Sequence, residues 1–171
     1  ILHECDTDRL QWRLGTRMDE DLTVDHLFEE GFDAVFVGVG LTDPVALPGA
    51  EVPDSGVIDA LSFLKRAKID EDFQAGGRVA VLGGGNTAMD AALTAKNMGA
   101  DDVYIVYRRS YPQMPAWPRE RDEALSAGVH FLILTQPLDY VSDENGVLRG
   151  LKVASTVLGE PDESGRRRPE V

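Results

Sequence analysis

The alternation of apolar and polar residues predicts few regular elements in the first part of this 171-residue chain. Thr23 is placed to cap a short helix that ends at Gly31. Asp33–Gly40 is a short, continuous apolar run bounded by turn residues, which is typical of a buried strand in a parallel sheet. Residues 41–56 are rich in proline and glycine and predict a loop, and Val57–Lys68 follows with apolar residues at helical spacing.

The clearest pattern begins at Val79, where short apolar strands start to alternate with helices. The second strand begins at Val103, a charged helix is expected over Arg119–Ala127, and a third strand over Val129–Leu134. This order predicts parallel strands joined by right-handed crossovers. After Gln136, turn signals separate strand-like runs and predict an antiparallel β-meander. The expected fold class is therefore α/β, a Rossmann-type parallel sheet with helices on its faces plus an antiparallel β-meander.

A glycine-rich turn follows the first of these strands, in the stretch "VAVLGGGNTAMDAALTAKNMGADDVYIVYRRS". Gly83-x-Gly85-x-x-Ala88 fits the G-x-G-x-x-G/A pattern: the first position permits a tight turn, the second lets a pyrophosphate approach the backbone, and the third lets the helix pack on the strand. Free N–H groups at the helix start favour phosphate. The predicted phosphate-binding residues are Gly83, Gly84, Gly85, Asn86, Thr87 and Ala88. The alternative is a structural turn that binds nothing.

The second strand ends on Arg108 and Arg109, where units of this kind usually place an acid that binds the ribose 2′-hydroxyl. Two guanidinium groups there suit a 2′-phosphate, which they can hold by charge-assisted hydrogen bonds. The pair therefore predicts a preference for NADP(H). A pair of surface arginines without a ligand remains the alternative.

Composition narrows the function further. The net charge of −13 argues against nucleic acid and against anionic membranes as partners. Cys5 is the one cysteine, so this chain alone supplies no disulfide framework and no iron–sulfur ligand set. The three histidines share no metal-ligand spacing, and no apolar run is long enough to span a membrane. These features predict a cytoplasmic protein without a metal site. The chain opens without a methionine, and we expect it to be a piece of a longer polypeptide.

The stretch that contains the glycine-rich turn and the arginine pair, together with "MPAWPRERDEALSAGVHFLILTQP" after it, resembles the NADPH-binding domain of the glutamate synthase small subunit. It is also similar to the flavin-containing half of dihydropyrimidine dehydrogenase. Upstream, "LTVDHLFEEGFDAVFVGVG" resembles the strand that connects the FAD domain of this family to its NADPH domain. The resemblance implies a division into residues 1–40 (FAD-domain segment and connecting strand), 41–77 (linker and helix) and 78–171 (NADP(H)-binding domain).

The resemblance also implies a function. In that family NADPH gives a hydride to FAD, and electrons pass through iron–sulfur clusters to a second active site. NADP(H) would bind this chain, FAD would bind the full-length protein, and the clusters would lie outside this chain. The partner would be a larger catalytic subunit or domain that accepts electrons. Gly38 and Gly40 would lie near the meeting point of the two cofactors. The cofactors carry this chemistry, so no catalytic side chain is expected.

Two other hypotheses remain at this stage. The chain could be an NADP(H)-binding sensor without redox chemistry, or a scaffold domain whose glycine turn binds nothing. Trp117 could stack on a base of a bound nucleotide, although a packing role in its proline-rich loop is the favoured interpretation.

Overall fold

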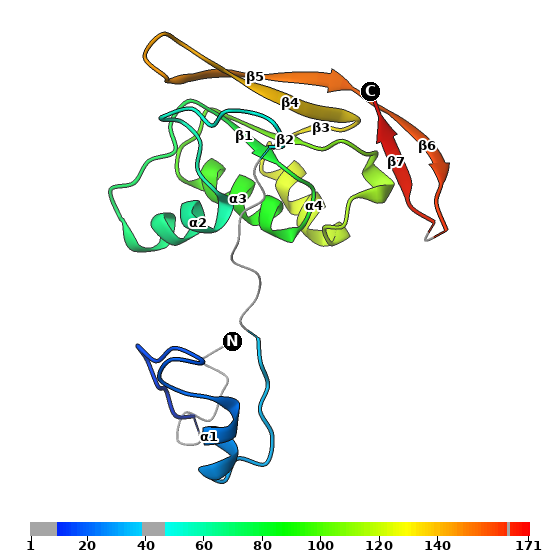
Figure 1. The fold of residues 1–171 in the computed structure, drawn as a ribbon. Coiled ribbons are helices and arrows are strands. Elements are labelled where there is room, and N and C mark those ends of the chain that lie inside the picture. Colours follow the sequence, from blue (N-terminus) through cyan, green and yellow to red (C-terminus); the bar gives the residue numbers. More distant parts are fainter. Residues whose placement is uncertain (1–9, 39–46, 164) are drawn as a thin grey trace. The chain divides into compact units, whose positions relative to one another are not determined.

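The computed structural model describes residues 10–38, 47–163 and 165–171. The chain forms two compact units, residues 1–41 and residues 42–171. Figure 1 shows the labelled elements of both. All residues of the buried hydrophobic cluster lie in the second unit, between Phe63 and Val129.

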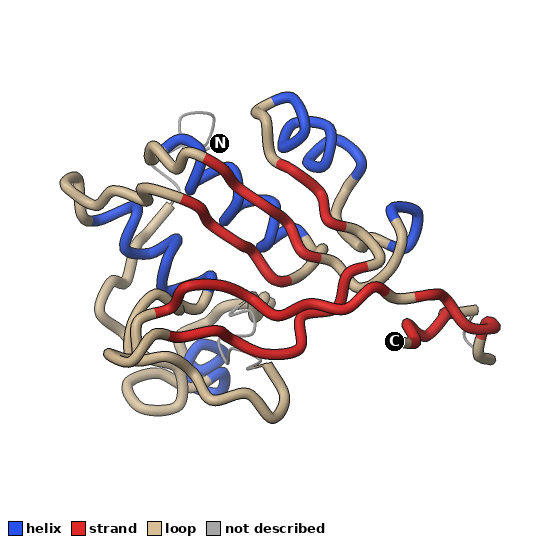
Figure 2. Tube along the Cα trace, turned by 90° about the horizontal axis from the view of Figure 1, so that it is seen from above, coloured by secondary structure: helices blue, strands red, loops and turns tan. Residues whose placement is uncertain are grey.

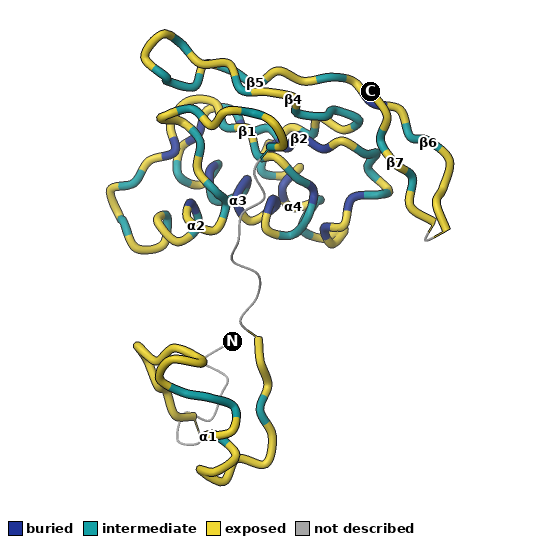
Figure 3. Tube along the Cα trace, in the orientation of Figure 1, coloured by how far each residue is buried: buried dark blue, intermediate teal, exposed yellow. Residues whose placement is uncertain are grey.

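The first unit contains one helix, α1 (Val24–Glu29), among its described residues. It begins where the sequence predicted, because the Thr23 side chain caps it by accepting a hydrogen bond from the backbone N–H of His26 at 3.2 Å. The chain leaves the helix through Gly31, whose φ is +94°. Figure 3 shows this helix mostly exposed, and no residue in it is buried.

The predicted buried strand over Asp33–Gly40 is wrong for the part that the structure describes. Residues 33–38 form no strand, and the Phe36 side chain is 95% exposed. The apolar run meets the compositional requirement for a buried strand. A strand also requires a neighbouring strand to satisfy its backbone N–H and C=O groups, and none pairs with this segment among the described residues.

The second unit is built on a parallel sheet of three strands, β1 (Arg78–Leu82), β2 (Asp102–Val106) and β3 (His130–Leu132), in the order β1-β2-β3. β2 is central, and its Val103 and Ile105 side chains are completely buried. This confirms the predicted strand–helix alternation. All three carboxyl ends lie at one edge of the sheet, where the glycine loop and the two arginines follow β1 and β2.

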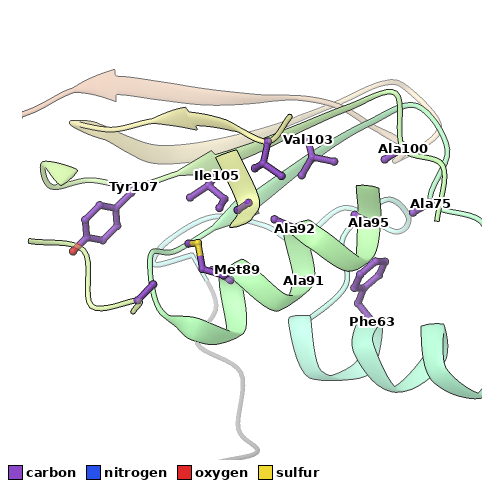
Figure 4. Packing of buried hydrophobic residues seen from close by; sticks show 14 of the residues in the cluster. Phe63, Ala75, Met89, Ala91, Ala92, Ala95, Ala100, Val103, Ile105 and Tyr107 are labelled. Atoms are coloured by element: carbon purple, nitrogen blue, oxygen red, sulfur yellow. The ribbon is translucent and has the colours of Figure 1, made fainter. Parts of the chain in front are cut away.

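Helix α3 (Asn86–Asn97) connects β1 to β2 and packs closely against both strands. Its buried face is made of small residues, which allows the helix backbone to approach the sheet. Figure 4 shows Ala91, Ala92 and Ala95 on this face together with Met89, and Figure 2 shows α3 (blue) behind the strands of the parallel sheet (red).

Two further helices complete this layer. Helix α4 (Pro118–Ser126) lies within one residue of its predicted bounds. Helix α2 (Ala60–Ile69) begins three residues later than the periodicity suggested, because the Asp59 side chain caps it through the backbone N–H of Ser62 at 2.9 Å. α2 packs on α3, and its Phe63 joins the core cluster. This helix of the predicted linker is therefore part of the folded unit.

After Gln136 the structure changes to antiparallel pairs, as the sequence predicted, and no helix crosses residues 147–158. The pairs are two separate hairpins rather than one continuous meander. β4 (Thr135–Ser142) pairs with β5 (Leu148–Ser155), and β6 (Val157–Pro161) pairs with β7 (Arg167–Glu170). The chain passes between the hairpins at Thr156, whose backbone N–H donates to the Leu134 carbonyl at 2.8 Å.

Candidate functional site

The glycine loop lies between the end of β1 and the start of α3. Gly83 has a φ of +138°, a conformation that side chains rarely adopt, and its N–H donates to the Val106 carbonyl at 3.1 Å. The turn out of β1 therefore requires glycine at this position. Ala88 is buried on the first turn of α3, and a Cβ added at Gly83 would lie 3.7 Å from the Ala88 Cβ.

Gly85 is the N-cap of α3, and the space above it is open. A Cβ placed on Gly85 would meet no atom within 4 Å. No side chain caps the helix, and the N–H groups of Asn86 and Thr87 have no acceptor among the described residues. Because unpaired N–H groups at a helix start carry partial positive charge, this arrangement fits an anionic group such as a phosphate.

Gly84 has a structural role that the fingerprint did not indicate. A Cβ at this buried residue would come within 2.7 and 2.8 Å of two carbon atoms of the Tyr107 ring, and within 3.1 Å of Met114. The Tyr107 ring is held in place because its hydroxyl donates to the Gln113 carbonyl at 2.7 Å. The only sequence signal was a third consecutive glycine where the pattern needs two.

The loop between β2 and α4 is hydrogen-bonded to the glycine loop at two points. The backbone N–H of Ala116 donates to the Gly84 carbonyl at 3.0 Å, and that of Trp117 donates to the Asn86 side-chain oxygen at 3.1 Å. The Asn86 amide therefore joins two loops, a role that sequence reasoning missed. The Trp117 side chain is 67% exposed, which contradicts the favoured packing role.

Arg108 and Arg109 follow β2 directly but differ in their surroundings. Arg108 is exposed, whereas Arg109 is half-buried and its Nε is buried without a hydrogen-bond partner among the described residues. Their backbone is fixed, because the Arg108 carbonyl accepts from the Thr156 hydroxyl at 2.8 Å and the Arg109 carbonyl accepts from the Leu134 N–H at 3.0 Å. The Arg108 side chain helps to line a pocket with Leu47, Pro48, Gln136, Pro137 and Leu138.

The remaining candidates lie elsewhere. Asp90 is exposed on α3 and lines a groove between α2 and α3. Gly38 is exposed in the first unit, and Gly40 lies outside the described residues.

The described part of the chain contains no group of three or more His, Cys, Asp or Glu residues that could hold a metal. It also contains no helix that is long and apolar enough to cross a membrane.

The β1–α3–β2 unit and its glycine turn place the chain among Rossmann-type α/β proteins. Residues 6–163 match the family model described as pyridine nucleotide-disulphide oxidoreductase, and the chain belongs to that family.

The chain is 39% identical to the small chain of NADPH glutamate synthase from Escherichia coli K12, over 95% of this chain and 36% of the relative. This confirms the resemblance recognised in the sequence. It is 40% identical to the beta subunit of an NADP(+)-dependent formate dehydrogenase from Moorella thermoacetica, over 91% of this chain and 22% of the relative. The chain thus spans about a fifth to a third of the length of these relatives. A solved structure of T. acidophilum thioredoxin reductase matches with a TM-score of 0.43 at 16% identity, over 66% of this chain and 31% of that one.

Proposed function

We propose that residues 42–171 bind NADP(H), with the pyrophosphate on the glycine loop and the 2′-phosphate at the arginine pair. The observation that carries this proposal is the open backbone at Gly85, next to two N–H groups without acceptors. The arginine pair follows the neighbouring strand, at the same edge of the sheet. The names of the two relatives, which include NADPH and NADP(+), support the same nucleotide.

In the full-length protein, NADPH would supply a hydride to FAD, and the electrons would pass to a larger catalytic subunit or domain. The names "small chain" and "subunit beta" of the relatives support such a partner. The residues of this chain bind and orient the nucleotide: the α3 N–H groups hold the pyrophosphate, and Arg108 and Arg109 hold the adenosine end. The FAD and any iron–sulfur clusters would be held by other parts of the protein.

The first unit fits a role beside the flavin. Its apolar segment at residues 33–38 exposes Phe36 and 57% of Val37, which is costly in water and favours pairing with a sheet supplied by the FAD domain. Gly38 and Gly40 would then lie where the nicotinamide and the flavin meet. This assignment is part of the proposal.

Calorimetric titration with NADPH and NADH tests the nucleotide assignment. A charge-assisted hydrogen bond contributes about 1.5–3 kcal/mol when shielded and less when water screens it. Two arginines at a partly exposed ribose should contribute roughly 2–3 kcal/mol, a preference for NADPH of about 30- to 150-fold. Arg108→Ala with Arg109→Ala should remove this preference and leave NADH affinity nearly unchanged, because the glycine loop is intact.

Arg78→Ala provides a matched control. It removes one arginine charge from the amino end of β1, the opposite end of the strand from the glycine loop, where Arg78 is exposed. We expect this variant to keep the wild-type preference. Added salt should weaken NADPH binding more than NADH binding, because only NADPH carries the extra phosphate. Equal affinities of the wild-type chain for the two nucleotides would contradict the proposal.

A further inference from the structure

Thr156 is the one buried polar residue among the described residues, with 5% of its surface exposed. It lies between the two hairpins, after β5 ends and before β6 begins. Its hydroxyl donates to the carbonyl of Arg108 at 2.8 Å, across 48 positions of the sequence. This hydrogen bond holds the Arg108 carbonyl in place, because breaking it would leave the hydroxyl of a buried residue unpaired.

The surroundings of Thr156 show why this contact matters to the arginine pair. Regular pairing of β2 with β3 ends at Val106 and Leu132, so the arginines lie beyond the sheet. The Leu134 N–H holds the Arg109 carbonyl, and the Leu134 carbonyl in turn holds the backbone of Thr156. Leu134 has a φ of +50°, which is unfavourable for a bulky residue, and its two hydrogen bonds help to stabilise this conformation.

The two arginines are therefore held differently. The Arg109 carbonyl is bonded to the backbone N–H of Leu134, just beyond β3, whereas the Arg108 carbonyl is bonded to the Thr156 side chain alone among the described residues. No ion pair fixes the exposed Arg108 side chain within the described part of the chain. The hydrogen bond from Thr156 is thus the contact that holds the backbone from which the Arg108 side chain extends.

We propose that Thr156 is a positioning residue for nucleotide selectivity, acting through the Arg108 backbone on the arginine that faces the 2′-phosphate. The inference rests on the proposed function. If this hydrogen bond were lost, the backbone at Arg108 could shift, and a small shift or tilt there would move the guanidinium at the end of the long side chain much further. Loss of the hydroxyl should therefore weaken NADPH binding and leave NADH binding unchanged, since the hydrogen bonds of Thr156 within the described residues go to Arg108 and Leu134 and not to the glycine loop.

The experiment compares Kd values for NADPH and NADH in the full chain carrying Thr156→Val, Thr156→Ser or Thr135→Val. The valine variant keeps the shape and the backbone hydrogen bond but loses the hydroxyl. We expect it to reduce the preference for NADPH by about 5- to 10-fold, the effect of one lost hydrogen bond. Serine should restore the wild-type preference. Thr135→Val is the matched control, because the Thr135 hydroxyl at the same junction donates to the Ile133 carbonyl rather than to an arginine.

A double-mutant cycle separates positioning from a general effect. In the Arg108→Ala background, Thr156→Val should change selectivity no further, because the side chain through which it acts is gone. An unchanged preference in Thr156→Val, or an equal loss of affinity for both nucleotides, would overturn the inference while leaving the proposed function intact. No preference in the wild type would overturn both. If Thr156→Val does not fold, Thr156→Ala replaces it, and failure of both to fold would overturn the positioning role.

Discussion

Gly84 and Gly85 are neighbours in one loop, yet a side chain at each position would meet different surroundings. A Cβ at Gly84 would press against the ring of Tyr107, which is buried and whose hydroxyl is hydrogen-bonded to the Gln113 carbonyl. Overpacking of this kind costs about 1–3 kcal/mol. We therefore expect Gly84→Ala to lower the free energy of unfolding by about that amount, measured by urea denaturation without nucleotide.

Gly85→Ala is the matched control for Gly84→Ala. Because its Cβ would enter open space, it should leave the free energy of unfolding nearly unchanged. The same space is where the proposed pyrophosphate would lie, so Gly85→Ala should weaken NADPH and NADH binding alike, by about 5- to 150-fold. A free energy of unfolding equal to that of wild type in Gly84→Ala would contradict the packing role of Gly84. Wild-type nucleotide affinity in Gly85→Ala would contradict the proposed pyrophosphate position.

In the glycine loop, the sequence could predict those residues whose type is required by the backbone conformation or the packing at their own position. Gly83 needs a positive φ, Gly85 needs an open approach, and Ala88 needs close helix packing, and each follows from its place in the fingerprint. The Asn86–Trp117 and Thr156–Arg108 hydrogen bonds join residues 31 and 48 positions apart. No periodicity or spacing encodes such pairs, because they depend on how the loops meet after the sheet has formed.

At the scale of elements, the sequence-based prediction was most accurate where the apolar pattern of a segment is enough to define a helix or a strand. Helix α3 and strands β1 and β2 form where the apolar pattern placed them. The prediction failed where an element depends on a neighbour. Residues 33–38 have a strand composition but no partner strand among the described residues. The expected meander separates into two hairpins at Thr156, whose backbone N–H donates to the Leu134 carbonyl.

The turn of the β4–β5 hairpin is held by the Asp143 carboxylate. One of its oxygens accepts from the backbone N–H groups of Asn145 at 2.9 Å and Val147 at 3.0 Å, and the other accepts from the Arg149 side chain at 2.8 Å. The Val147 N–H, followed by the Arg149 side chain, holds the pKa of Asp143 below the ordinary value of 3.8. The ionised form is therefore stabilised in the folded hairpin.

This lowered pKa predicts an acid-sensitive hairpin. Because the folded pKa lies below the unfolded one, the contribution of Asp143 to stability is fully present above pH 3.8 and is lost as the pH falls through the folded pKa. Asp143→Asn should be less stable than wild type near neutral pH, and the difference should disappear in acid. Urea denaturation of both chains from about pH 7 to about pH 2 measures that difference.

Glu144→Gln is a suitable control for this measurement, because it removes an equal charge from an exposed position in the same turn. We expect its difference from wild type to stay small over the whole range. A difference between wild type and Asp143→Asn that persists undiminished at the lowest pH would show that the carboxylate charge does not hold the turn.

At the scale of the whole molecule, the division into two units separates the proposed nucleotide contacts from the proposed flavin contacts. The buried core and every proposed phosphate-binding residue lie within residues 42–171, whereas Gly38 and Gly40 belong to residues 1–41.

We expect residues 42–171 alone to unfold in one cooperative transition and to bind NADPH with the affinity of the full chain, within about twofold. Circular dichroism during thermal unfolding and calorimetric titration measure the two properties. The Gly38→Ala variant of the full chain should likewise keep its NADPH affinity, because its proposed role begins only when flavin is present. A loss of more than about tenfold on removing residues 1–41 would assign part of the nucleotide site to the first unit.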